Sequence, residues 1–231
     1  MKNIYIITGG TLVHVSPHFS LCAPAYGKVG EEIHSNLNEI HNSSETNIYL
    51  IKTKMAGISD DETKEKLASI GYKGDIETNE DIRKLTKAIA SDNATVGIVM
   101  SAAICDFEPD KLAIKDSHEI ITKFGKSQKR LHKAESVSLD LVAAPKVIDT
   151  IKSINPDIKL VTFKTTAGES EVEILTKGSF NLARSSSDYV FCNDIHTKQN
   201  LVVSSCGAVF RATSRSEALN ILCSKLISAI S

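Results

Sequence analysis

Short apolar runs recur along the chain between turn-forming residues. They cover residues 4–7, 48–51, 96–100, 160–163 and 189–192. Each run is four or five residues long and rich in β-branched side chains, which is typical of strands buried on both faces of a parallel sheet. We therefore expect five such strands. In parallel sheets ligands bind beyond the carboxyl ends of the strands, so the residues that follow each run are the first place to look for function.

Segments with helical periodicity separate these runs. Residues 81–90 place Ile82, Leu85 and Ile89 on one face, and Thr78 or Asn79 offers an N-cap. Residues 146–153 and 216–230 show similar apolar stripes. The alternation predicts an α/β fold, a Rossmann-like, mostly parallel sheet with helices on both faces. At 231 residues the chain is expected to form a single domain, residues 1–231.

Two stretches interrupt this rhythm. Residues 111–136 are rich in lysine and arginine, contain Gly125 and lack a clear period, while residues 137–142 alternate like an edge strand. We interpret residues 111–136 as a flexible basic flap, and a solvated loop without a function is the alternative. Residues 13–26 hold two prolines at a place where a helix is expected to begin.

Composition excludes several classes of partner. The 27 basic and 28 acidic side chains are balanced, which argues against binding to nucleic acid or to a membrane surface. The five cysteines form no CxxC pair, so neither a disulfide framework nor a metal centre is predicted. The short apolar run at the start is neither a signal segment nor a membrane span, so we expect a cytoplasmic protein.

Glycines stand where a nucleotide could approach the backbone. The sequence TGGT at residues 8–11 follows the first strand, and GKVG at residues 27–30 opens the next helix, whose N-terminus favours an anion. The pattern is neither the GxGxxG fingerprint nor a P-loop, which argues against a dehydrogenase. A tight turn explains TGGT equally well.

Three later strands also end in residues suited to a site. The third is followed by SAAICDF at residues 101–107, in which small residues let a substrate lie against the backbone. Asp106 is there either a hydrogen-bond acceptor for the substrate or a helix cap. Phe163 ends the fourth strand and packs either on a base or in the core. Asn193 ends the fifth, where the next residue, Asp194, also suits an Asx-turn.

Taken together, these pieces resemble the phosphopantothenate-cysteine ligase family, particularly its stand-alone form without a fused flavin decarboxylase. The matching motifs are, in order, ITGGT (7–11), GKVG (27–30), AAICDF (102–107), APKVI (144–148), TFK (162–164) and DYVFCND (188–194). The resemblance spans nearly the whole chain. It implies a Rossmann-like homodimer that activates the carboxylate of 4'-phosphopantothenate with CTP or ATP and Mg²⁺, and joins the product to cysteine in coenzyme A synthesis.

The resemblance also assigns roles to residues of this chain. The residues that it implies for the nucleotide are Gly10, Thr11, Gly27, Gly30, Phe163, Arg184 and Asn193. Those facing the substrate are Ala102, Ala103 and Asp106, of which Asp106 is also implied in catalysis. Counting back from the matched Pro145 places the catalytic lysine of the family at Lys129, with Arg130 as the next candidate.

One loop departs from the family pattern. Where the family has Asp, Arg and Asn, an ungapped count gives Ser16, Phe19 and Ala23 here, and Tyr26 replaces a small hydroxyl residue. Loss of one preorganised donor costs about 2.7 to 4 kcal/mol of transition-state stabilisation. Three explanations stay open. The neighbouring His14 or His18 compensates, the chain acts on another carboxylate, or it is a non-catalytic regulator that binds nucleotide or phosphopantothenate.

Overall fold

A seven-stranded sheet forms the centre of the protein in this computed structural model, which describes residues 1–41, 45–116, 120–121, 125–128, 130 and 137–230. The strand order is β12-β11-β10-β9-β5-β1-β4. Five parallel strands correspond to the five apolar runs: β1 (Lys2–Thr8), β4 (Thr46–Lys52), β5 (Thr95–Met100), β9 (Lys159–Thr166) and β10 (Tyr189–Asp194). Two antiparallel strands, β11 (Asn200–Ser204) and β12 (Val209–Ala212), complete one edge. The predicted α/β fold class is confirmed.

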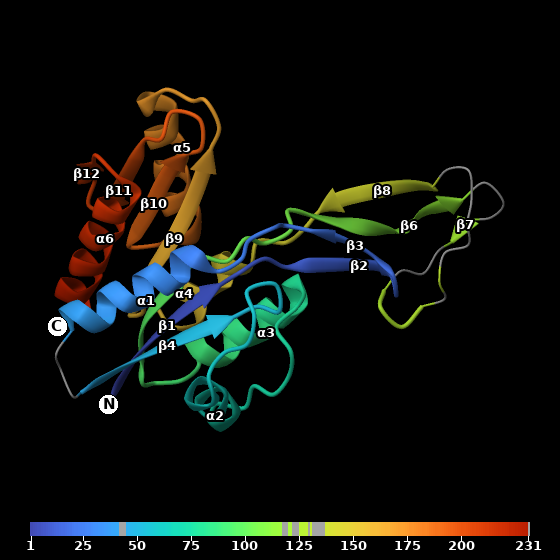
Figure 1. The fold of residues 1–231 in the computed structure, drawn as a ribbon, viewed down its shortest axis with the longest axis horizontal. Coiled ribbons are helices and arrows are strands. Elements are labelled where there is room, and N and C mark those ends of the chain that lie inside the picture. Colours follow the sequence, from blue (N-terminus) through green and yellow to red (C-terminus); the bar gives the residue numbers. More distant parts are fainter. Residues whose placement is uncertain (42–44, 117–119, 122–124, 129, 131–136, 231) are drawn as a thin grey trace.

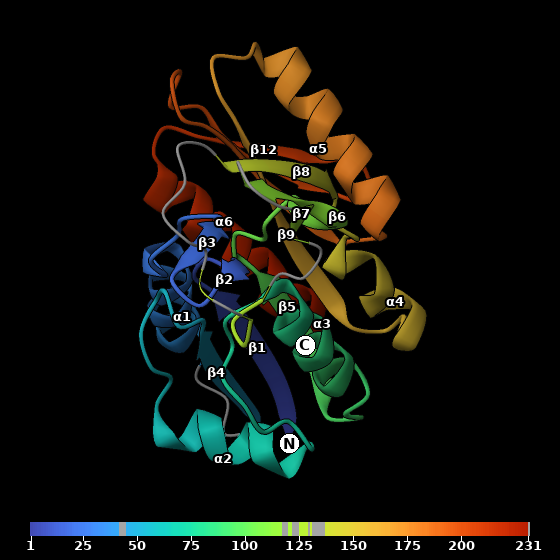
Figure 2. The same ribbon diagram turned by 90° about the vertical axis from the view of Figure 1, so that its right-hand side faces the viewer.

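Helices cover both faces of this sheet (Figures 1 and 2). One face packs against α1 (Lys28–Ile40) and α6 (Arg215–Ile230). The other packs against α2 (Asp61–Ser69), α3 (Asn79–Ala90), the 3₁₀ turn η1 (Val147–Thr150), α4 (Ile151–Ile154) and α5 (Glu171–Ser185). The helices predicted over residues 81–90 and 216–230 are confirmed, and the one over 146–153 is half 3₁₀ turn.

Strand β1 shows why the parallel strands are apolar throughout. Ile4 and Ile6 pack with α1 and α6, while Tyr5 and Ile7 pack with α2 and α3. All four side chains are fully buried. Because successive side chains of a strand point to opposite faces, a strand covered on both sides needs apolar residues at every position.

An arm of two small sheets extends from the carboxyl ends of the parallel strands (Figure 1). It comprises the hairpin of β2 (Leu12–Ser16) and β3 (Phe19–Cys22), and a three-stranded sheet of β6 (Phe107–Asp116), β7 (Ile120–Ile121) and β8 (Val137–Ala143). The edge strand predicted over residues 137–142 is confirmed as β8, which among the described strands pairs only with β6.

The expectation that a helix begins within residues 13–26 is wrong. Val13 and Val15 are buried and alternate with the partly buried His14, the period of a strand, and Pro17 lies in the tight connection between β2 and β3. The helix begins only at Lys28, after Gly27 has taken up a left-handed backbone conformation with φ of 84°.

The segment predicted as a flap lies only partly within the described residues. Residues up to 116 form β6, residues 120–121 form β7, and residues 125–128 form a turn. Residues 117–119, 122–124, 129 and 131–136 lie outside the description, and the flap stays a prediction. In the described part of the chain, every helix is too short or too polar to cross a membrane.

Candidate functional site

A cleft of about 620 Å³ opens at the carboxyl ends of β5, β9 and β10. Its walls come from the loop after β5, the ends of β9 and β10, η1, the last turns of α5 and the first residue of α6. It brings together six residues that the sequence assigned to a site, namely Ala102, Ala103, Asp106, Phe163, Arg184 and Asn193.

Positive charge dominates the walls of this cleft. Lys146, Lys164, Arg184 and Arg215 all line it, whereas Asp106 is the single carboxylate among the described lining residues. Lys146 is paired with Asp106. Lys164 and Arg215 form no ion pair with any residue that the structure describes. A concave surface with surplus cations attracts an anionic ligand.

Arg184 is held in place from two sides. Its Nη1 donates to both carboxylate oxygens of Asp149, at 2.7 and 2.9 Å, and its Nη2 donates to Oδ1 of Asn181 at 2.9 Å. Asn181 is itself buried, and its Nδ2 donates to the hydroxyl of Thr162 at 3.1 Å. These contacts lock the guanidinium at the wall of the cleft before any ligand is present, since its planar fork suits two-point contacts.

Phe163 and Asn193 lie at the ends of two neighbouring strands. The ring of Phe163 is half-buried and lies 5.2 Å from that of Phe191, centroid to centroid, so part of it faces the cleft and part joins the core. Oδ1 of Asn193 accepts a hydrogen bond from the Thr165 hydroxyl at 3.0 Å. An aromatic face beside a side-chain amide suits recognition of a nucleobase.

Asp194, by contrast, is used within the fold. Its carboxylate accepts hydrogen bonds from the Thr166 hydroxyl and from the backbone N–H groups of residues 168, 169, 196 and 197. Burial alone would raise the pKa of this carboxyl group, but these donors hold the pKa of Asp194 far below its usual range. The bonds to residues 196 and 197 form the Asx-turn that the sequence offered as an alternative.

Thr11 is also turned into the protein. Its fully buried hydroxyl donates to Oδ1 of Asn79 at 2.7 Å and accepts from the N–H of Cys105 at 2.9 Å. Asn79 in turn donates through Nδ2 to the carbonyl of Cys105 at 2.8 Å. The pair therefore joins the glycine turn after β1 to the loop that carries Ala103 and Asp106.

The predicted glycines Gly10, Gly27 and Gly30 are not among the described residues that line the cleft. A Cβ atom at Gly10 would lie 2.0 Å from the carbonyl oxygen of Ala23, and one at Gly30 would lie 2.4 Å from Cβ of Thr8. At Gly27 the nearest atom is Cβ of Ala56, at 2.8 Å. Close packing within the protein thus explains these glycines, and contact with a nucleotide stays a prediction.

Of the two basic residues suggested for catalysis, Lys129 lies outside the described residues. Arg130 is exposed. Their role therefore stays a prediction.

The divergent loop brings Pro24 and Ala25 to the cleft. Neither side chain carries a hydrogen-bond donor. His14 lies elsewhere, with Nδ1 2.9 Å from the hydroxyl of Ser20 and Nε2 3.4 Å from Glu77, and His18 is exposed. Neither histidine lines the cleft.

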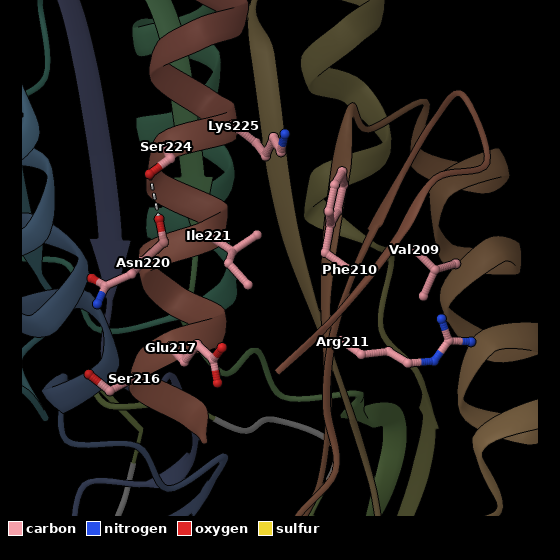
Figure 3. Close-up of a pocket in the computed structure, with 9 residues that line it drawn as sticks. All are labelled: Val209, Phe210, Arg211, Ser216, Glu217, Asn220, Ile221, Ser224 and Lys225. Carbon is pink, nitrogen blue, oxygen red and sulfur yellow. Dashed lines mark hydrogen bonds between the residues drawn. The ribbon is translucent and has the colours of Figure 1, made fainter. Parts of the chain in front are cut away.

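A second hollow of about 860 Å³ lies between β12 and α6 (Figure 3). There the Lys225 ammonium lies 4.6 Å from the centroid of the Phe210 ring, and Arg211 is paired with Glu171. Both cations thus already have partners, and the hollow contains none of the residues predicted for a site. The cleft is the candidate site.

Sequence reasoning gave no role to three of the four cations in the cleft. Lys146 and Lys164 belong to the motifs APKVI and TFK. Lys164 directly follows the apolar run of residues 160–163, and Lys146 follows the edge strand predicted over residues 137–142, so their positions were a usable signal. Arg215 gave no such signal, because only the fold brings the start of α6 beside β10.

Comparisons with known proteins find related chains, although no family model matches. The coenzyme A biosynthesis bifunctional protein CoaBC of Thermococcus kodakarensis is 25% identical over 194 residues, which are 84% of this chain and 41% of that protein. The chain thus spans about two fifths of the length of this relative.

Solved structures share the fold. A DNA/pantothenate metabolism flavoprotein from Streptococcus pneumoniae matches with a TM-score of 0.76 and 19% identity, over 99% of both chains. The C-terminal domain of a CoaBC protein matches with a TM-score of 0.65 and 12% identity, over 99% of this chain and 93% of that one. A Cab2 mutant in complex with phosphopantothenate-cysteine matches at 0.66 and 16%, over 98% and 85%. The resemblance found in the motifs is thus confirmed in whole-sequence and fold comparisons.

Proposed function

We propose that the protein is a phosphopantothenate-cysteine ligase, which activates the carboxylate of 4'-phosphopantothenate with CTP or ATP and condenses it with cysteine. The observation that carries the proposal is the cleft, in which Phe163 and Asn193 lie beside Lys164, Arg184 and Arg215. The relatives and fold neighbours, whose names refer to coenzyme A biosynthesis, pantothenate metabolism and phosphopantothenate-cysteine, support the same substrate.

The cleft provides for both parts of a nucleoside triphosphate. Its aromatic and amide groups suit the base, and its cations suit the phosphates. Arg184 offers a rigid contact because Asp149 and Asn181 already hold it, so little side-chain entropy is lost on binding. The unpaired Lys164 and Arg215 supply charge that no described carboxylate cancels.

The proposed chemistry has two steps. A carboxylate oxygen of the substrate first attacks the α-phosphorus of the nucleotide, and the bond to the pyrophosphate oxygen breaks. The amine of cysteine then attacks the activated acyl carbon, loses a proton and displaces the nucleoside monophosphate. Both steps bring anions together, so cations that neutralise charge at phosphorus favour the transition state. Ala102 and Ala103 have small side chains, which let the acyl group lie close to the backbone.

Mg²⁺ fits this cleft as a companion of the nucleotide. The ion binds through phosphate oxygens and one or two carboxylates and keeps several waters. Asp106 supplies one exposed carboxylate at the wall, and in the described part of the chain no group of three acidic, histidine or cysteine side chains could hold a metal by itself. Bound there, Mg²⁺ would withdraw charge from the phosphate oxygens.

The test is a measurement of pyrophosphate release by the purified protein. CTP or ATP is supplied with 4'-phosphopantothenate and Mg²⁺, with and without cysteine, and the ligated product is identified by mass. We expect pyrophosphate release to depend on the phosphopantothenate. The nucleotide that gives the higher kcat/KM is the natural one. Nucleotide binding without any pyrophosphate release would contradict the proposal.

A non-catalytic regulator of the same fold is the second candidate. The observation that favours it is the divergent loop, which has Ala23 where the family pattern has an asparagine and brings Pro24 and Ala25 to the cleft. A regulator would bind nucleotide or phosphopantothenate and release no pyrophosphate with any carboxylate. A related ligase for another carboxylate would release pyrophosphate with one member of a carboxylate panel.

A further inference from the structure

Glu77 is a nearly buried acid on which three basic side chains converge. It lies in the loop before α3 with 8% of its surface exposed. Lys126 Nζ lies 2.8 Å from Oε2, His14 Nε2 lies 3.4 Å from the same oxygen, and Lys54 Nζ lies 3.4 Å from Oε1. Burial by itself would raise the pKa of Glu77, but the contacts with Lys126 and Lys54 lower it, so the group is charged at neutral pH.

The backbone around Glu77 is fixed by the rest of the fold. Its carbonyl accepts a hydrogen bond from the N–H of Leu12 at 2.8 Å, and its own N–H donates to Asp81 at 3.2 Å. Asp81 belongs to the capping box that begins α3. Glu77 thus presents its charge from a rigid support at the base of β2.

One of the three cations comes from the segment that was predicted as a flap. Lys126 lies in the turn of residues 125–128, whose first N–H, that of Gly125, donates to the carbonyl of Val15 in β2 at 3.2 Å. The turn closes on itself through the bond from the N–H of Gln128 to the carbonyl of Gly125, at 3.1 Å. In Figure 1 this yellow-green turn lies beside the blue hairpin of β2 and β3.

We infer that Glu77 is a positioning residue, which docks the turn of residues 125–128 on the β2–β3 hairpin through Lys126 and so anchors the turn from which the chain continues. Lys129 comes next in the sequence, and its part in catalysis rests on the proposed function. The β2–β3 hairpin thus supplies the surface on which the turn of residues 125–128 is docked.

Lys54 provides a matched control. It contacts the same carboxylate, and its side chain is 55% exposed, against 56% for Lys126. It follows β4, however, and does not belong to the basic segment. Replacing either lysine by glutamine removes one positive charge from beside Glu77. Only Lys126→Gln is expected to release the turn, because Lys54 is not part of it.

The first experiment follows hydrogen exchange of the amides of residues 125–128, which needs no ligand and no activity. We expect exchange in Lys126→Gln and Glu77→Gln to be roughly twofold to fivefold faster, the range set by one ion pair. In Lys54→Gln it should stay within about twofold of the parent, by the same reasoning. Equal exchange in the parent and Lys126→Gln would overturn the docking, even if Glu77→Gln fails to fold.

The second experiment measures kcat and KM for pyrophosphate release. We expect Lys126→Gln to lower kcat about tenfold with an unchanged KM for the nucleotide, since a displaced catalytic segment affects the step after binding. Lys54→Gln should change neither constant. If Lys126→Gln showed faster exchange but kept the kcat of the parent, Glu77 would stabilise the turn without positioning a catalytic group. A parent protein without ligase activity would instead refute the proposed function, while the exchange data would still decide the docking.

Discussion

Arg184 and Asp149 form a two-point contact across the cleft wall, in which a single guanidinium nitrogen reaches both carboxylate oxygens within 2.9 Å. The contact joins the last turn of α5 to η1, and the two residues are 35 positions apart in sequence. Both residues are about one third exposed, so their mutual attraction is screened and contributes little to stability. Its effect is on the direction in which Arg184 points.

The first prediction tests that direction. Arg184→Gln should weaken nucleotide binding about tenfold or more, because a charge-assisted contact contributes roughly 1.5 to 3 kcal/mol. Asp149→Asn leaves the guanidinium in place and removes its orientation, so we expect a smaller loss of about two- to fivefold, from the weaker range of an exposed pair. Isothermal titration with CTP and ATP measures both. Affinity equal to the parent in Arg184→Gln would remove this residue from the nucleotide site.

The second prediction concerns the basic segment. Lys129→Gln keeps much of the side-chain length and removes the charge, so formation of the acyl-nucleotide should slow about a hundredfold, as for loss of one preorganised contact to a transition state. Arg130→Gln checks the position in the sequence, because a shift by one residue would exchange the two results. Single-turnover pyrophosphate release measures the step. Parent rates in both variants would favour the regulator over the ligase.

The third prediction concerns the glycine turn. Gly10→Ala would put a Cβ atom 2.0 Å from the Ala23 carbonyl oxygen, so we expect a loss of folding stability of about 1 to 3 kcal/mol, typical of overpacking. Gly97→Ala is the control, since the atoms nearest to its Cβ would be those of Ile4, at an ordinary contact distance of 3.4 Å. Urea unfolding measures both variants. A fully stable Gly10→Ala that no longer binds nucleotide would show that the ligand, and not the protein, requires this glycine.

The fourth prediction concerns acid stability. The pKa of Asp194 is lower in the folded protein than in the unfolded chain, so its charge stabilises the fold above the unfolded pKa of about 3.9. That contribution is lost as the pH falls below this value. Asp194→Asn should therefore be less stable than the parent at pH 7, and the difference should shrink below about pH 4. Urea midpoints at several pH values measure it, with the exposed Asp157→Asn as control. A constant difference across pH would contradict the linkage.

The fifth prediction is a homodimer. The arm leaves one edge of β8 unpaired among the described strands, and Phe107, Leu141 and Val142 are exposed on it. Strand β12 forms one of the two edges of the large sheet. Pairing such edges across a two-fold axis would protect them. Sedimentation at micromolar concentration should show twice the 25.0 kDa of the chain. A single 25.0 kDa species would contradict the dimer.

The elements that could be predicted from sequence are those with one uninterrupted pattern. The five buried strands could be predicted because nearly every position in them is apolar, and α3 could be predicted because its apolar residues recur every three or four positions. Helix α5 did not, because Val172 and Phe180 are 73% and 69% exposed while Ile174 is buried, so its apolar residues do not mark one face. The β2–β3 hairpin was missed because it contains no uninterrupted apolar run: polar His14 and Ser20 alternate with apolar residues, and Pro17 lies between the strands.

The candidate site was predictable wherever its residues end an apolar run or follow it closely. Ala102 and Asn193 follow two of the runs, Phe163 ends a third, and all three line the cleft. Arg215 follows none of these runs closely, because it reaches the cleft from the start of α6. The contacts of Thr11 with Asn79, and of Lys126 with Glu77, join residues 68 and 49 positions apart. No local pattern encodes such a contact, since it depends on how the elements pack.

The contacts of Asn79 also bear on the order in which the molecule folds. This side chain connects Thr11, 68 residues earlier, with Cys105, 26 residues later. Closing loops of that length costs chain entropy before any contact compensates, so contacts of this kind form late on a folding pathway. We therefore expect the turn after β1 and the loop after β5 to become ordered together, once α3 has docked. During synthesis Asn79 can hold the loop that carries Ala103 and Asp106 only after Cys105 has left the ribosome, although β1 is made earlier.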